Sequence, residues 1–149
     1  MVISMISNIE CADCIHSIYQ SAYRIEADLI GVVTFPPLDR TAYEIRTSEN
    51  IFYAAMHNDI YLGIIEIEQS LNSQEPAIIA SLAVSPAYSR QGVGQLLVKF
   101  ILERHSPIVV GTAGKNLPAI NLYEKLGFTR TRTFFTAEGI PMVELVFGK

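Results

Sequence analysis

The chain has 149 residues, of which 50% are hydrophobic and 17% charged, so an intrinsically disordered chain is excluded and one domain over 1–149 is expected. The 15 acidic residues outnumber the 11 basic ones, and the formal net charge of −4 argues against nucleic-acid binding through phosphates. No apolar run approaches the ~18 residues of a membrane span, and the N-terminus lacks the basic stretch of a secretory signal. We therefore expect a cytoplasmic protein that does not bind a membrane.

The first half of the chain predicts two helices followed by a hairpin. Apolar residues recur at spacings of four and three over 11–22, which is typical of an amphipathic helix. We expect that helix to end before a segment at 26–34 and a proline-containing loop, and a short second helix to span about 39–48. Residues 51–57 and 60–68 are rich in strand formers and predict the hairpin.

The helix over 11–22 contains the two cysteines of the chain, Cys11 and Cys14, with His16 close behind. A C-x-x-C pair serves as half of a zinc site or as a redox pair in other proteins. No second C-x-x-C and no H-x-x-x-H follows in the sequence to complete a zinc site. We therefore favour packing on the helix over metal or redox chemistry, and we expect no bound metal.

The second half of the chain predicts alternating strands and helices. Residues 77–84 form a nearly continuous apolar run, which indicates a strand buried on both faces. Helical spacing predicts helices over 93–101 and about 118–126, with a short strand at 108–111 between them. A closing hairpin is expected over 128–147. The order helix, helix, three strands, helix, strand, helix and two strands predicts a mixed α/β sheet of six or seven strands flanked by about four helices.

A glycine-containing segment, Arg90-Gln91-Gly92-Val93-Gly94, joins the strand at 77–84 to the following helix. The first turn of a helix has unpaired N–H groups and the positive end of the helix dipole, and glycines let a ligand approach the backbone closely. These features predict a phosphate site to which Arg90 adds a cation. A glycine-rich helix start with no ligand is the alternative, because neither G-x-G-x-x-G nor G-x-x-x-x-G-K-[ST] is complete.

A second motif runs from Asn116 to Phe128 and predicts a helix that has Pro118 in its first turn and ends at Gly127. Tyr123 shares a helical stripe with Ala119, so we expect it to point inward, where a tyrosine hydroxyl usually finds a polar partner. On one interpretation, that partner is the sulfur of a ligand. On the other, it is a backbone carbonyl, and the helix then only packs against the sheet.

These segments together resemble the GNAT superfamily of N-acetyltransferases. The matching blocks are Leu82-Ala83-Val84, Arg90-Gln91-Gly92-Val93-Gly94, and Asn116, Ala119-Ile120, Leu122-Tyr123 and Leu126-Gly127-Phe128. The resemblance is strong over about 78–128 and agrees elsewhere only in the order of elements. It implies a GNAT-like acyl-CoA N-acyltransferase fold. It also implies that an amine attacks acetyl-CoA directly in a ternary complex.

The resemblance also assigns roles to particular residues. The backbone of 82–84 would bind the pantetheine arm as an added strand, and the amides of 90–94 with Gln95 would hold the pyrophosphate. Tyr123 would lie at the thioester sulfur as general acid for the thiolate. The implied cofactor-binding residues are Leu82, Ala83, Val84, Arg90, Gln91, Gly92, Val93, Gly94, Gln95, Asn116 and Tyr123. The implied acceptor is a small-molecule amine or a peptide N-terminus, and a homodimer is one oligomeric state left open.

Two departures from the family pattern concern the phosphate loop and the catalytic base. Ser89 stands where the family usually has Gln or Arg, and 78–79 holds two isoleucines where many relatives carry Glu. We choose Glu66 as the base, with Glu68 or Ser81 and an ordered water as alternatives. On the alternative interpretation, which is the more ordinary one, both glutamates are charges on a solvated strand face.

The acceptor pocket is expected around 23–40 and 134–141. Glu26 and Asp28 would attract a cationic amine there, or they are exposed loop charges. A non-catalytic acyl-CoA-binding or regulatory module on the same fold is the alternative function, and a purely structural domain is a third.

Overall fold

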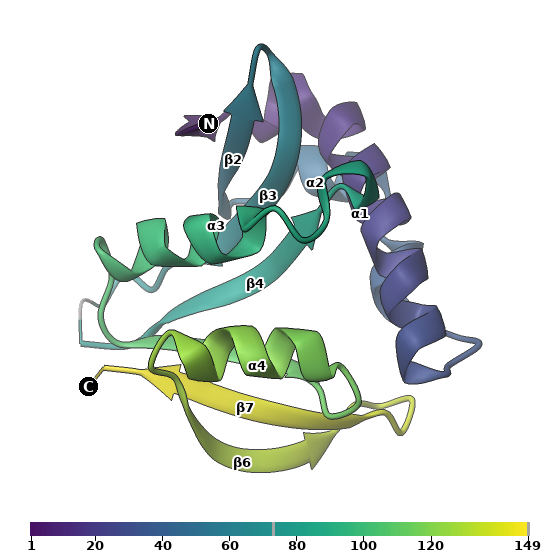
Figure 1. Cartoon of the computed structure of the whole chain (residues 1–149), viewed down its shortest axis with the longest axis vertical. Coiled ribbons are helices and arrows are strands. Elements are labelled where there is room, and N and C mark those ends of the chain that lie inside the picture. The colour runs from purple at the N-terminus through teal and green to yellow at the C-terminus, as the bar shows by residue number, and fades with distance from the viewer. Residues whose placement is uncertain (73, 149) are drawn as a thin grey trace.

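The computed structural model describes residues 1–72 and 74–148, and seven strands in it form one mixed sheet (Figure 1). The elements in chain order are β1 (Val2–Ile6), α1 (Asn8–Ile30), the 3₁₀ turn η1 (Pro36–Asp39), α2 (Ala42–Arg46), β2 (Ile51–His57), β3 (Ile60–Glu68), β4 (Ala77–Val84), the 3₁₀ turn η2 (Pro86–Tyr88), α3 (Val93–Leu102), β5 (Ile108–Ala113), α4 (Leu117–Lys125), β6 (Thr129–Phe135) and β7 (Pro141–Phe147). The strand order is β1-β2-β3-β4-β5-β7-β6. The predicted mixed sheet of six or seven strands with about four helices is confirmed.

The N-terminal strand β1 is an element that the sequence analysis missed. It pairs antiparallel with β2, from Val2 opposite Met56 to Ile6 opposite Phe52. β1 is five residues long and lies at an edge of the sheet, so it has one neighbour and no clear alternation of buried and exposed side chains. The first element is therefore a strand and not the predicted helix.

Helix α1 is longer than the sequence analysis predicted. It continues to Ile30 because Ala27 and Ile30 keep its apolar face buried. It ends at Gly31, whose left-handed backbone (φ 75°) lets its N–H donate to the carbonyl of Ala27. The predicted end before residue 26 was wrong, and Glu26 and Asp28 lie on a helix instead of in a loop. The second helix is in turn shorter than predicted.

Helices cover both faces of the sheet. On one face, α3 and α4 contribute Leu97 and Ile120 to the larger core cluster. On the other face, Ile15 of α1 and Ile45 of α2 pack against Phe52 of β2. Figure 1 shows α3 beside β2–β4 and α4 beside β7, so the two helices of the first face cover different halves of the sheet.

A β-bulge at Ala80 shapes the centre of the sheet. The pairing of β3 with β4 shifts by one residue between Glu66 and Ile67 of β3, and Ala80 of β4 is left without a partner. The parallel pairing of β4 with β5 ends at the same place, where Ile79 lies opposite Val110. From Ala80 onward, β4 is paired with β3 on one edge while its other edge is free of β5.

β4 lacks the two buried faces that its apolar run predicted. Buried and more open side chains alternate along it, and Ile78 is 38% exposed. Ala80 and Leu82 line a cavity. The prediction failed because an apolar run also suits a strand that borders a cavity.

Candidate active site

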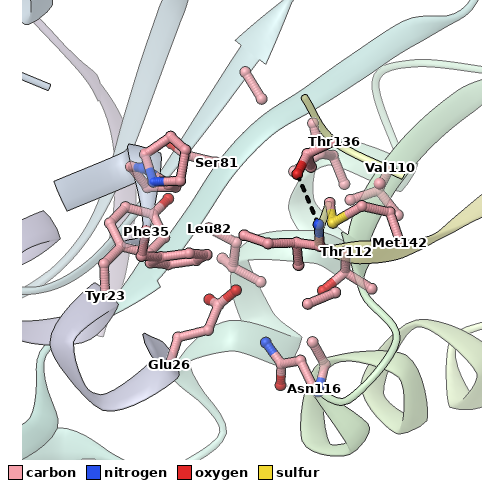
Figure 2. A pocket seen from close by; sticks show the side chains of 18 of the residues that line it. Tyr23, Glu26, Phe35, Ser81, Leu82, Val110, Thr112, Asn116, Thr136 and Met142 are labelled. Carbon is pink, nitrogen blue, oxygen red and sulfur yellow. Dashed lines mark hydrogen bonds between the residues drawn. The ribbon is translucent and has the colours of Figure 1, made fainter. Parts of the chain in front are cut away.

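A cavity of about 360 Å³ lies where β4 and β5 stop pairing. Its lining residues are Tyr23, Glu26, Phe35, Pro36, Pro37, Ile79, Ala80, Ser81, Leu82, Val110, Gly111, Thr112, Ala113, Asn116, Ala119, Tyr123, Thr136, Glu138, Ile140 and Met142. Figure 2 shows side chains from α1, the following loop, β4, β5 and the last hairpin converging on this space. The cavity therefore draws on both segments from which the sequence predicted an acceptor pocket.

The N-terminus of α3 leaves backbone N–H groups without a partner in the helix. The turn before it places Arg90 and Gly92 in the left-handed region, with φ of 63° and 78°. Gly92 is the N-cap residue and offers no side-chain cap, and the first bond of the helix runs from Leu96 N to the Gly92 carbonyl. Within the described chain, the N–H groups of 93–95 therefore have no backbone partner in the helix. This arrangement suits an anionic ligand.

The start of α3 lies against the end of β4 and against α4. A Cβ atom built on Gly94 would lie 3.6 Å from Val84 and 3.5 Å from Leu122, which is ordinary contact distance. The fold thus brings the turn at 90–95, the end of β4 and α4 together. The side chain of Ala83 is buried on the opposite face, in the cluster that α1 covers, so a contact of this residue with a ligand in the cavity would involve its backbone.

Tyr123 on α4 both packs in the core and lines the cavity. It is 3% exposed, and its ring centroid lies 5.2 Å from that of Phe128. Burial, together with the nearby Tyr23 and Glu26, raises the pKa of Tyr123 well above its ordinary value. The hydroxyl therefore keeps its proton at neutral pH. Among the residues that the structure describes, no other side chain accepts a hydrogen bond from the Tyr123 hydroxyl.

Glu66 lies at the centre of a buried hydrogen-bond network. Arg40 donates to both carboxylate oxygens, at 2.6 and 2.9 Å, and forms an ion pair with them. Asn50 donates at 2.8 Å, Ser81 at 2.9 Å and Tyr19 at 3.2 Å. The carboxylate is 0% exposed, so the solvated strand face expected for this glutamate is wrong.

The protonation of Glu66 follows from these contacts. Burial opposes the charge, but hydrogen bonds from Arg40, Asn50 and Ser81 outweigh it and hold the pKa of Glu66 below its ordinary value. Ser81 lines the cavity, and Glu66 lies behind it as the acceptor of its hydroxyl proton. These contacts favour a structural role for Glu66 over the predicted role of base, while Glu68 is exposed at the end of β3.

Glu26 is a cavity residue that the sequence analysis undervalued as a loop charge. It is half-buried on α1, and Figure 2 shows its carboxylate directed into the cavity toward the Asn116 amide. Burial raises the pKa of Glu26, and the nearby Asn116 amide partly opposes this rise. The sequence did contain an indication that Glu26 faces the cavity. The helical spacing of Tyr19, Tyr23 and Glu26 places two hydroxyl groups and a carboxylate on one face of α1.

Asn116 holds the start of α4. Its Oδ1 accepts a hydrogen bond from Ala119 N at 3.2 Å, which caps the helix. Its amide group is left to face the cavity and Glu26. Asn116 is thus 9% exposed and positioned to contact a ligand that enters between β4 and β5.

The two cysteines lie on α1. No group of three metal-binding His, Cys, Asp or Glu side chains occurs within the described residues. Cys11 is half-buried with its Sγ 3.3 Å from the Tyr61 hydroxyl, and Cys14 is exposed. Across the same residues, no helix combines the length and apolar character of a membrane span.

Comparisons with known proteins agree with this geometry. The family described as "Acetyltransferase (GNAT) domain" matches residues 31–147. The UPF0157 protein YqkA of Bacillus subtilis is 30% identical over 80% of this chain and 35% of its own length. The peptidyl-lysine N-acetyltransferase YiaC of Escherichia coli is 30% identical over 62% of this chain and 57% of its own length. The chain thus spans about a third to just over half of these curated relatives.

Solved structures share the fold at lower identity. The structure of yncA from Salmonella typhimurium with its cofactor acetyl-CoA superimposes with a TM-score of 0.73 at 16% identity, covering 99% of this chain and 93% of that one. At this identity the likeness concerns the fold alone. The family match covers most of the chain, and the separation of β4 from β5 after Ile79 is consistent with it. The chain therefore belongs to the GNAT acetyltransferase family.

Proposed function

We propose that this chain transfers the acetyl group of acetyl-CoA to an amine. The observation that carries the proposal is a single continuous arrangement of three features. The uncapped amides at the start of α3 lie beside the free edge of β4, and that edge leads into the cavity that Tyr123 lines. YiaC, which is named a peptidyl-lysine N-acetyltransferase, supports an amine as acceptor.

The residues present fit acetyl-CoA. The N–H groups of 93–95 suit a diphosphate, and the segment 85–94 carries no acidic side chain that would repel it. The free edge of β4 after Ala80 offers backbone groups to an extended pantetheine arm, with Leu82 and Asn116 lining the way. Acetyl-CoA supplies an acetyl group activated as a thioester.

The side chains of the cavity supply positioning and a proton. The Tyr123 hydroxyl keeps its proton because its pKa is raised, and it is free to donate a hydrogen bond into the cavity. Such a bond stabilises negative charge that develops on a leaving sulfur. Apolar walls, among them Phe35 and Met142, exclude water from the same space. Direct attack by the amine within one cavity requires no covalent intermediate on the enzyme.

Binding and turnover of acetyl-CoA test the proposal directly. Acetyl-CoA at about 100 times its Kd should raise the free energy of unfolding by about 2.7 kcal/mol and the melting temperature by several degrees. Thiol release from acetyl-CoA across a panel of amines and peptides should then show turnover. A melting temperature that acetyl-CoA leaves unchanged contradicts the proposal. A shift without thiol release on any amine supports the alternative of a non-catalytic acyl-CoA-binding module.

Replacing Tyr123 by Phe should lower turnover and leave acetyl-CoA affinity nearly unchanged. The loss of one hydrogen bond to a developing charge predicts a decrease in kcat of about 10- to 100-fold. Tyr53→Phe is the matched control, because Tyr53 lies in the same core cluster and does not line the cavity. Steady-state kinetics and acetyl-CoA titrations on both variants make the comparison. An unchanged kcat for Tyr123→Phe would give this tyrosine a packing role alone.

A further inference from the structure

We propose that Glu26 binds the ammonium group of the acceptor and removes its proton, and that the acceptor is a primary amine on an apolar body. This inference rests on the proposed acetyltransferase function and names the acceptor side of the same site. It replaces the prediction of Glu66 as base.

Glu26 is placed to meet a ligand, whereas Glu66 is not. Glu26 lines the cavity, and Figure 2 shows its carboxylate pointing into it. Glu66 is fully buried, and Arg40 neutralises its charge through two hydrogen bonds. A carboxylate that already accepts two bonds from a guanidinium is a poor proton acceptor. Glu26 has Asn116 as its polar contact and keeps acceptor capacity for a ligand.

The charge of the cavity favours a cation. Glu26 and Glu138 are its charged lining residues, and no Lys, Arg or His of the described chain lines it. Removing a carboxylate from water without a counter-ion is costly, so a ligand that carries an ammonium group completes the site. The aromatic rings of Tyr23 and Phe35, whose centroids are 6.0 Å apart, stand in the same wall and favour a cation at their faces.

The remaining walls define the rest of the acceptor. The loop after α1 contributes Phe35 and Pro36-Pro37, and the last hairpin contributes Ile140 and Met142. The same hairpin adds Thr136 and Glu138, but the apolar side chains form most of this wall, so they favour an aliphatic or aromatic body over a strongly hydroxylated one. One ammonium at Glu26 and an apolar body against the opposite wall is the acceptor that this cavity accommodates.

The chemical step at Glu26 is a proton transfer. An N–H bond of the bound ammonium breaks, an O–H bond forms on the Glu26 carboxylate, and nitrogen keeps the electron pair that it needs for attack. The raised pKa of Glu26 makes this carboxylate a better proton acceptor than an exposed one, because burial disfavours its charge. The proton leaves to solvent through the mouth of the cavity, and no oxidant or further reactant is required.

Kinetics of Glu26→Gln with 2-phenylethylamine and acetyl-CoA test the inference. At pH 7, kcat/KM should fall about 100-fold, which is typical for loss of a general base. The deficit should shrink as the pH rises toward about 10, because the free amine then predominates and needs no base. The other titratable groups that share the cavity are Tyr23, Tyr123 and Glu138. They are unchanged in the variant, so a pH-dependent deficit belongs to Glu26.

Asp28→Asn is the matched control, since it makes the same change of charge on the same helix at an exposed position outside the cavity. It should keep kcat/KM within about twofold of the wild type. Calorimetric titration with CoA present should show that 2-phenylethylamine binds the wild type at least tenfold more tightly than 2-phenylethanol, and that Glu26→Gln loses this preference. Acetyl-CoA should still raise the melting temperature of Glu26→Gln.

The outcomes separate this inference from the proposed function. If the wild type neither binds acetyl-CoA nor releases thiol, the proposed function fails and the inference fails with it. If the wild type is active and Glu26→Gln matches it at pH 7, Glu26 is not the base and the inference alone is overturned. If the wild type acetylates other amines and never 2-phenylethylamine, the apolar acceptor class is wrong. A Glu26→Gln deficit that is constant from pH 6 to 10 also contradicts proton removal by Glu26.

Discussion

Replacing Glu66 by Ala is expected to lower the free energy of unfolding by about 3 kcal/mol, the lower end of the cost of breaking a buried ion pair, because the Arg40 side chain keeps 27% of its surface exposed. Arg40 would lose both of its short hydrogen bonds to the carboxylate, and Asn50 and Ser81 would each lose an acceptor. Total stabilities of about 5–15 kcal/mol make this a large fraction. Urea unfolding measures the effect.

Glu68→Ala is the matched control because Glu68 lies two residues further along β3 and is exposed. It should change the free energy of unfolding by about 0.5 kcal/mol at most. Replacing Arg40 and Glu66 together by Met should restore part of the loss, since a buried pair exchanged for apolar side chains is often tolerated. A Glu66→Ala variant as stable as the Glu68→Ala control would show that the network contributes little.

The ion pair of Arg40 with Glu66 should also make the free energy of unfolding depend on pH. The pKa of Glu66 is lowered on folding, so its contribution is fully present above its unfolded value of about 4.5 and is lost as the pH falls through the lower folded value. The difference in free energy of unfolding between wild type and Glu66→Gln should therefore be largest above about pH 4.5. It should shrink at lower pH in urea titrations. A difference that stays constant from pH 7 to 3 would contradict the ionised pair.

The same pair explains how the acceptor side of the cavity is held. Arg40 follows η1, and the loop at 35–40, which contains η1, carries Phe35 and Pro36-Pro37 into the cavity wall. Glu66 on β3 fixes that loop to the centre of the sheet through Arg40. Loss of Glu66 should thus disturb binding of the amine more than binding of acetyl-CoA, whose expected contacts lie at the start of α3.

Most of the fold was predictable because its elements repeat their periodicity locally. The hairpin of β2 and β3 and the helix α3 appear within two residues of their predicted bounds. β1 was missed because an edge strand of five residues leaves little alternation in the sequence. The divergence of β4 from β5 was also not predictable. It begins at Ala80, the residue of β4 that has no partner in β3, and the local sequence does not indicate which residues pair across strands.

The candidate site was predictable where local motifs build it and not where distant segments meet. Glycines predict the turn at 90–94, and a proline with helical spacing predicts the helix that carries Tyr123. The partnership of Arg40 with Glu66 joins positions 26 residues apart, and nothing in either local sequence indicates it. The role of Glu26 was missed for a related reason. The sequence analysis ended the first helix before residue 26 and so placed Glu26 in a loop, whereas α1 continues to Ile30 and directs it into the cavity.

Replacing Gly92 by Glu should weaken binding of acetyl-CoA by about 1,000-fold, the largest effect expected on ligand affinity. Gly92 precedes the uncapped amides of α3, so a carboxylate there would compete for them and repel a diphosphate. Repulsion between unit charges about 4 Å apart is worth about 4 kcal/mol near a protein surface, which is about 1,000-fold in Kd. Calorimetric titration with acetyl-CoA measures it.

Gly31→Glu separates that electrostatic effect from backbone strain. Gly31 and Gly92 have nearly the same left-handed conformation, with φ of 75° and 78°, and a Cβ atom on either meets nothing within 4 Å. Both variants should therefore lose about 1–2 kcal/mol of stability from the unfavourable backbone. Gly31 lies at the end of α1, away from the amides of α3, so its variant should bind acetyl-CoA like the wild type. Equal affinities for the two variants would mean that the diphosphate does not bind at the start of α3, and the assignment of that turn would fall with it.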